Sequence, residues 1–136
     1  MGKIQFDPIL LAMSIKLLIA DDAPFIIQVT KSLIESRQIH VVGEAIDGED
    51  AVKKALELKP DAIFMDMVMP NKNGVEATKE ILTELPETKI IAVSTLDDDF
   101  MKEKALNAGC SDYIIKPFNR GDLIKSLERA LGVDLS

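Results

Sequence analysis

Residues 61–70 read Asp-Ala-Ile-Phe-Met-Asp-Met-Val-Met-Pro, an apolar run that ends in the carboxylate of Asp66 and is followed by Gly74. Short, continuous apolar runs are typical of parallel strands that are buried on both faces of a sheet. In open α/β folds, ligands bind at the edge where the carboxyl ends of the strands lie. We therefore expect Asp66 to end a buried strand at a functional edge of a parallel sheet.

Two other apolar runs also end in charged residues. Residues 15–20 lead directly into Asp21 and Asp22, and residues 113–115 lead into Lys116. Because the carboxyl ends of parallel strands lie at the same edge of a sheet, three acids and one lysine are expected to meet there.

Strand-length apolar runs alternate with segments of helical periodicity along the chain. The expected strands lie near residues 15–20, 40–45, 62–66, 89–94 and 112–115, and the expected helices near 24–36, 49–58, 74–84, 98–108 and 120–131. This alternation predicts one doubly wound α/β domain, with a parallel five-stranded sheet and helices on both faces.

The alternation covers residues 15–131, which we take as the folded domain, and residues 132–136 follow it as a C-terminal tail. Residues 1–14 lie outside the alternation as an N-terminal extension of unknown role. Either Met13 is the natural start of the chain, or Pro8–Met13 forms a short apolar turn that packs on the domain or on a neighbour.

The composition narrows the possible functions. A chain of 136 residues fits one domain with one core. The net charge of -7 argues against nonspecific nucleic-acid binding, which needs clustered Lys and Arg. The single cysteine, Cys110, excludes an internal disulfide and a cysteine-based metal site. No run reaches transmembrane length and the first residues lack signal-peptide features, so we expect a cytoplasmic protein without a membrane partner.

The three acids suggest a specific chemistry. Asp21, Asp22 and Asp66 would repel one another unless a cation lay among them, and hard carboxylate oxygens suit Mg²⁺. One carboxylate could then attack phosphorus and form an aspartyl phosphate. Lys116 would neutralise one phosphoryl oxygen, since phosphoryl transfer depends mainly on positioning and charge neutralisation.

A hydroxyl at the end of the fourth strand, Ser94 or Thr95, could hydrogen-bond another phosphoryl oxygen. Taken alone, each of these residues has an ordinary interpretation. An Asp after a strand is usually a helix cap or turn former, and Lys116 could be a solvated loop lysine. Their joint occurrence at the ends of the first, third, fourth and fifth strands is the stronger signal.

The chain closely resembles the receiver domain of two-component response regulators (CheY-like) from about Ile15 to Leu131. The resemblance lies in three stretches: Ile19-Ala20-Asp21-Asp22-Ala23, Asp66-Met67-Val68-Met69-Pro70 with Gly74, and Tyr113-Ile114-Ile115-Lys116-Pro117-Phe118. It implies a flavodoxin-like fold with the strand order 2-1-3-4-5. It also implies that Asp66 is the phosphoacceptor and that Asp21 and Asp22 hold Mg²⁺. Asp22 is then the more direct ligand, Asp21 acts partly through water, and the backbone carbonyl of Val68 completes the protein's ligands.

The resemblance assigns further roles near the site. Lys116 pairs with the acyl phosphate and is joined to Pro117 by a cis peptide bond. The switch hydroxyl of relatives lies 22 residues before this lysine, which selects Ser94 over Thr95. Tyr113 corresponds to the aromatic residue that turns inward on activation. Apolar residues stand two positions after Asp66 and after Ser94, which predicts slow self-dephosphorylation.

The same resemblance implies the partners. A sensor histidine kinase or phosphotransfer protein would supply the phosphoryl group. The surface of the fourth helix (98–108), fifth strand (112–115) and fifth helix (120–131) would bind a downstream effector or output domain. The phosphorylated protein could form a homodimer, and no direct contact with nucleic acid is expected.

Three alternatives compete with a stand-alone phosphorylated receiver. The chain could be the receiver fragment of a longer transcriptional regulator, or a pseudo-receiver that works as an interaction module without phosphorylation. A haloacid-type phosphatase would require an Asp-x-Asp pair after the first strand, whereas Asp21 and Asp22 are adjacent.

Overall fold

The computed structural model describes residues 14–136, so the expectations for the segment before Ser14 fall outside the described residues. Five strands form one parallel sheet in the order β2-β1-β3-β4-β5. They are β1 (Ile15–Ala20), β2 (Ile39–Ala45), β3 (Ala62–Asp66), β4 (Lys89–Ser94) and β5 (Asp112–Ile115). The predicted flavodoxin-like α/β fold is confirmed.

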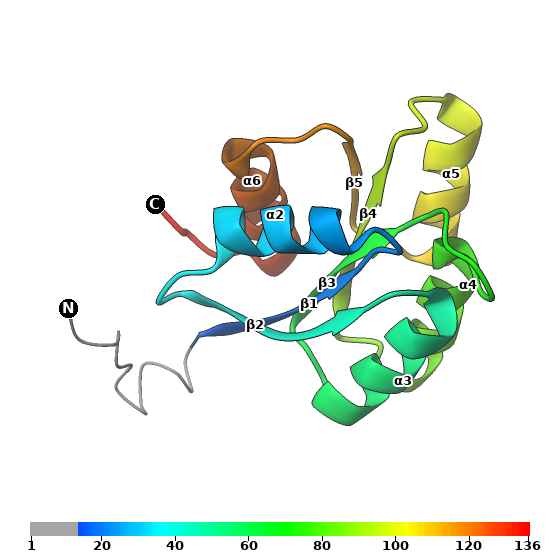
Figure 1. The fold of residues 1–136 in the computed structure, drawn as a ribbon, viewed down its shortest axis with the longest axis horizontal. Helices are drawn as coiled ribbons and strands as arrows, with labels where there is room; N and C mark the ends of the chain where they lie inside the picture. The colour runs from blue at the N-terminus through cyan, green and yellow to red at the C-terminus, as the bar shows by residue number, and fades with distance from the viewer. Residues whose placement is uncertain (1–13) are drawn as a thin grey trace.

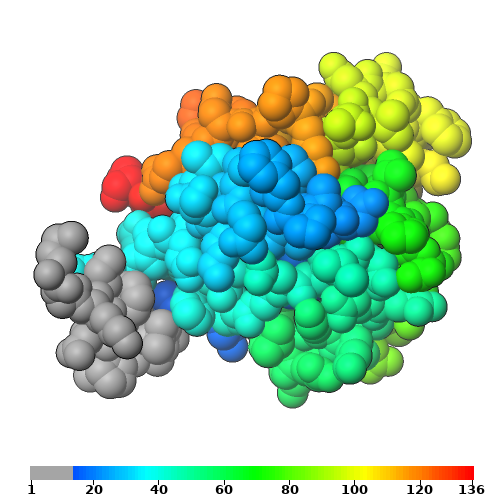
Figure 2. All heavy atoms as spheres, viewed as in Figure 1, coloured from blue at the N-terminus to red at the C-terminus, as the bar shows by residue number. Residues whose placement is uncertain are grey.

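Five helices connect and follow these strands. They are α2 (Pro24–Ile34), α3 (Gly48–Leu58), α4 (Gly74–Glu84), α5 (Asp99–Ala108) and α6 (Arg120–Leu131). Helices α2 and α6 cover one face of the sheet, and α3, α4 and α5 cover the other (Figure 1). In the space-filling view, α2 lies at the front of the molecule between α6 above it and α3 below it (Figure 2).

The alternation of side chains along each strand builds two cores. Leu17, Ile19 and Phe64 face α2 and α6, whereas Leu18 and Ile63 face the three helices on the other side. All five side chains are buried, which is why the sequence shows continuous rather than alternating apolar runs.

The predicted element boundaries are close to the observed ones, and the differences have local causes. Helix α2 ends at Ile34, before the predicted end at residue 36, because Glu35 is extended and the Ser36 N–H bonds to the Ile39 carbonyl. Asp98 was expected as the first residue of the fourth helix, but it lies just outside α5 as its N-cap. Its side chain accepts a hydrogen bond from the Met101 N–H at 2.7 Å.

The residues after α6 pack on the domain. The Leu135 side chain is buried in the core beneath α2 and α6, and the Leu135 N–H donates to the Glu128 carboxylate at 2.9 Å. Among the described residues, none of the helices combines the length and the apolar character that a membrane span requires.

Candidate functional site

Three carboxylates meet at the carboxyl edge of the sheet. Asp21 and Asp22 follow β1, and Asp66 is the last residue of β3, the strand that pairs with β1. One oxygen from each carboxylate lies within 4.8 Å of the others. Asp21 and Asp66 are 3% and 6% exposed, whereas Asp22 is exposed. Two nearly buried carboxylates this close together repel each other when both are ionised, so a positive charge nearby would stabilise their ionised forms.

The backbone after β1 fixes Asp21 without using it as a helix cap. Its Oδ1 accepts a hydrogen bond from the Ala23 N–H at 2.9 Å, and its own N–H bonds to the Ala45 carbonyl at the end of β2. Helix α2 begins with Pro24 at its first turn, and Ala23 occupies the N-cap position. Proline is favoured there because its missing N–H would have no partner in the helix. The capping interpretation of Asp21 therefore fails.

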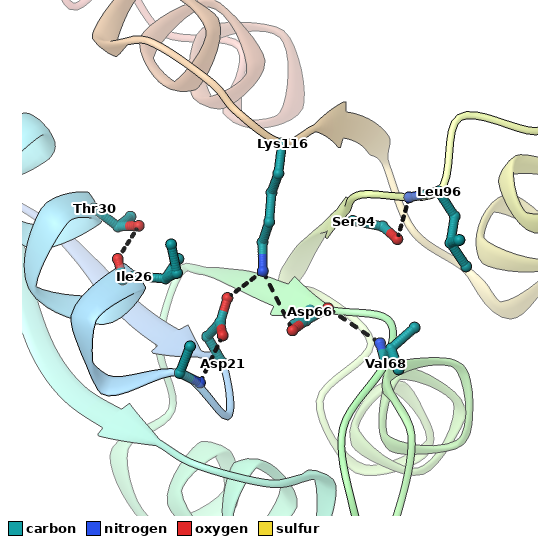
Figure 3. A network of polar contacts seen from close by, with 9 residues as sticks. Asp21, Ile26, Thr30, Asp66, Val68, Ser94, Leu96 and Lys116 are labelled. Carbon is teal, nitrogen blue, oxygen red and sulfur yellow. Dashed lines mark hydrogen bonds and ion pairs between the residues drawn. The ribbon is translucent and has the colours of Figure 1, made fainter.

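Lys116 supplies the positive charge. It follows β5 and extends between the two buried acids, with its Nζ 2.6 Å from Asp21 Oδ2 and 3.3 Å from Asp66 Oδ2 (Figure 3). Only 15% of the Lys116 side chain is exposed. The ordinary interpretation of Lys116 as a solvated loop residue is therefore wrong. The Lys116–Pro117 peptide bond is cis.

The pocket shifts the protonation of both partners. Burial raises the pKa of Asp66, and the nearby charge of Asp21 adds to this shift; the Val68 N–H and the charge of Lys116 oppose it only in part. Burial tends to lower the pKa of Lys116, but its hydrogen bond to Asp21 and the charges of Asp66 and Asp21 raise that pKa overall. Lys116 therefore stays charged at neutral pH, whereas the ionised form of Asp66 is less favourable in this pocket than it would be in water.

The turn after β3 completes the surroundings of Asp66. The Val68 N–H donates to Asp66 Oδ1 at 3.1 Å (Figure 3). Gly74 lies against the backbone of Asp66, since a Cβ at this glycine would stand 2.2 Å from the Asp66 carbonyl oxygen. Only glycine permits this approach, which explains why it follows the aspartate in this turn.

The candidate switch residues lie beside the acids and share one contact. Ser94 ends β4, is 1% exposed, and its Oγ accepts a hydrogen bond from the Leu96 N–H at 3.0 Å. The Tyr113 hydroxyl donates to the carbonyl of the same Leu96 at 2.6 Å. Thr95 is exposed. Leu96 thus connects Ser94 with Tyr113, a connection that the sequence does not indicate.

The fold and this acidic pocket define a class of protein. The profile of the response regulator receiver domain matches residues 17–128, and the chain belongs to this family. It is therefore a phosphoacceptor signalling module, and its acidic triad has the form typical of the Mg²⁺ site of receiver domains.

Similar proteins and structures agree with this membership. The chemotaxis protein CheY of Thermotoga maritima is 40% identical over 114 residues, which are 84% of this chain and 95% of that protein. The response regulator domain of Thermotoga maritima CheB has a TM-score of 0.80 at 38% identity, covering 89% of this chain and 98% of that domain. The receiver domain of the sensor histidine kinase PA1611 from Pseudomonas aeruginosa has a TM-score of 0.79 at 33% identity, covering 88% of this chain and 99% of that domain. That structure has a magnesium ion coordinated in its active-site cleft.

Proposed function

We propose that this protein is a phosphorylated response regulator, in which Asp66 accepts a phosphoryl group from the phosphohistidine of a sensor histidine kinase or phosphotransfer protein. The observation that carries the proposal is the Asp66 carboxylate itself. It is nearly buried, it has one oxygen on the Val68 N–H and the other on Lys116 Nζ, and it lies beside Asp21 and Asp22.

In the transfer, an oxygen of Asp66 forms a bond to phosphorus as the phosphorus–nitrogen bond of the donor breaks. The electron pair of that bond stays on the imidazole nitrogen of the donor, which takes up a proton from solvent. The Lys116 ammonium lies within reach of the acid and neutralises a phosphoryl oxygen. The acyl phosphate is negatively charged, and Lys116 is the cationic side chain beside it.

The donor set fits Mg²⁺, which prefers a few carboxylates and retains several waters. Asp21, Asp22 and Asp66 would hold the ion, together with the backbone carbonyl of Val68. When bound, Mg²⁺ neutralises developing charge on the phosphoryl oxygens. Asp21 is shared with Lys116 in the structure, so Asp22, which is exposed, is the acid most open to direct binding.

The switch then follows from the contacts of Leu96. A phosphoryl group on Asp66 would attract the Ser94 hydroxyl, whose present partner is the Leu96 N–H. Because the Leu96 carbonyl holds the Tyr113 hydroxyl, a movement of this loop changes the position of Tyr113. Thr95 is the less suitable switch hydroxyl, because it is exposed whereas Ser94 is buried.

The output surface would consist of α5, β5 and α6. Tyr113 lines a groove there together with Lys125 and Arg129, and Phe100 and Leu106 of α5 are 71% and 52% exposed. A downstream effector, an output domain or a second phosphorylated copy would bind this surface. Residues 15–131 form the receiver domain in this proposal, and the segments on either side have no assigned signalling role.

Intact-mass spectrometry after incubation with acetyl phosphate tests the proposal. The wild type should gain the mass of one phosphoryl group only when Mg²⁺ is present, and Asp66→Asn should gain none. A wild type that gains no mass at saturating Mg²⁺ would favour the pseudo-receiver alternative. The length of the full gene would decide whether the domain belongs to a longer transcriptional regulator.

A further inference from the structure

The turn between β2 and α3 contacts both loops that carry the acids, although it holds none of the predicted ligands. We call residues 45–48 the brace. At one end, the Ala45 carbonyl accepts the N–H of Asp21 at 2.9 Å. At the other end, Asp47 and Gly48 contact the loop between β3 and α4.

The Asp47 carboxylate makes two different contacts with its two oxygens. Oδ1 accepts the Asp50 N–H at 2.7 Å and thereby caps α3. Oδ2 accepts the side-chain amide of Asn71 at 2.9 Å, across 24 residues of sequence. The hydrogen bonds from the Asp50 N–H and from Asn71 lower the pKa of Asp47, so the carboxylate is ionised at neutral pH and is the better acceptor.

Asn71 and Lys72 bring the loop close to the brace. Asn71 has a φ of 67°, a conformation that asparagine tolerates better than most residues. The Lys72 carbonyl packs on Gly48, where an added Cβ would lie 1.9 Å from its oxygen. Asp47 therefore holds the loop through a side chain, while Gly48 provides the space that the loop backbone occupies.

This loop also bears the groups that surround the phosphoacceptor. Its first part contains Val68, whose N–H binds Asp66 Oδ1, and its last part reaches Gly74, whose N–H bonds to the Met67 carbonyl at 3.1 Å. The ends of the loop are thus fixed by its own backbone. Its middle is held to the rest of the molecule by Asn71 and Lys72, and the latter also pairs with Glu80.

We propose that Asp47 is a positioning residue for the phosphorylation site, which orders the loop carrying the Val68 backbone groups by holding Asn71. This inference rests on the function proposed above. Asp47 does not touch the acids, so it acts on Mg²⁺ binding through Asn71 and the loop. The brace also joins this loop to the backbone of Asp21, so both parts of the metal site depend on the same turn.

Two substitutions remove the Asp47–Asn71 contact from opposite sides. Asp47→Ser retains an N-cap side chain, because serine caps helices as well as aspartate does, but it is too short to reach Asn71. Asn71→Gly removes the amide and suits the positive φ. The matched control is Asp98→Ser, since Asp98 caps α5 with the same 2.7 Å bond and lies in a different loop.

Calorimetric titration with Mg²⁺ measures the effect directly. We expect Asp47→Ser and Asn71→Gly each to weaken Mg²⁺ binding roughly tenfold, which is a common loss when a residue that supports a metal ligand is replaced. The double variant should be no weaker than either single variant, since both remove the same contact. The rate of phosphorylation by acetyl phosphate should return toward the wild-type value at saturating Mg²⁺, and Asp98→Ser should bind Mg²⁺ like the wild type.

The inference is overturned if folded Asp47→Ser and Asn71→Gly bind Mg²⁺ as tightly as the wild type, or if Asp98→Ser loses as much affinity as they do. Circular dichroism before each titration establishes that the variants are folded. A wild type that binds no Mg²⁺ and accepts no phosphoryl group would instead refute the proposed function itself. The wild-type titration therefore separates the two failures.

Discussion

Replacing Lys116 with methionine should destabilise the metal-free protein strongly, and Mg²⁺ should reverse much of that loss. The methionine keeps most of the apolar stem but removes the charge that lies 2.6 Å from Asp21 and 3.3 Å from Asp66. Two carboxylates that are only 4% and 8% exposed in their side chains would then face each other without a cation.

The size of the effect follows from this burial. Removing one partner of a buried ion pair costs about 3–5 kcal/mol, and the lower end applies here because the pocket opens to solvent at Asp22. A loss of about 3 kcal/mol lowers the Tm of a domain of this size by roughly 12 °C. Mg²⁺ at 100 times its Kd would restore about 2.7 kcal/mol. At the same Mg²⁺ concentration, the variant should gain more stability than the wild type, because no lysine competes with the ion for the acids.

Thermal and urea unfolding, followed by circular dichroism in EDTA and in Mg²⁺, measure both effects. The matched control is Lys102→Met, which removes an exposed ion pair with Asp97 and should change stability little. A Lys116→Met protein that is as stable as the wild type in EDTA would refute the bridging role of this lysine. An equal gain from Mg²⁺ in both proteins would refute the competition between lysine and metal.

Four further outcomes are expected. Burial raises the pKa of Asp66 in the folded protein, so the wild type loses stability as pH rises above the pKa of this residue in the unfolded chain. Asp66→Asn should therefore be more stable than the wild type in metal-free buffer at neutral pH. Urea titrations should show this difference in the free energy of unfolding shrinking as pH falls. Gly74→Ala places a Cβ 2.2 Å from the Asp66 carbonyl and should cost about 1–3 kcal/mol in urea unfolding, together with a slower gain of the phosphoryl group. Burial raises the pKa of Cys110 to about 11, so iodoacetamide at mildly alkaline pH should alkylate it only as fast as the protein unfolds, and rapid alkylation of the folded protein would contradict its burial. Val68 and Leu96 are apolar and partly exposed at the site, so neither side chain can hydrogen-bond a water that attacks the phosphoryl group, which should be lost slowly. Replacing both with polar residues that hydrogen-bond this water should shorten the lifetime of the acyl phosphate measured by intact mass.

Much of the fold can be predicted from the sequence because each strand is buried on both faces. Ile63 and Phe64 are adjacent yet belong to opposite cores, so the whole run is apolar and its ends are visible as the charges of Asp61 and Asp66. Helix ends were less exact where a side chain or the backbone decides them. Asp98 lies outside α5 because its side chain caps that helix, and α2 ends before Glu35 because the backbone of Glu35 is extended.

The composition of the site was also predictable, but its contacts were not. The order of acids and lysine along the chain places them at one edge, whereas the shorter distance of Lys116 to Asp21 than to Asp66 depends on side-chain packing in three dimensions. The contact of Asp47 with Asn71 is long-range, and in sequence the pair Asp47-Gly48 indicates only a turn. The burial of Leu135 could not be predicted either, because an isolated apolar residue after a helix shows no hydrophobic periodicity.

Locating the phosphoryl group on the chain tests the central claim most directly. After incubation with acetyl phosphate and Mg²⁺, borohydride reduces an aspartyl phosphate to homoserine with release of inorganic phosphate, and peptide sequencing by mass spectrometry identifies the reduced position. We expect homoserine at position 66 and nowhere else. Homoserine at position 21 or 22, with Asp66 intact, would show that the phosphoacceptor has been assigned to the wrong carboxylate.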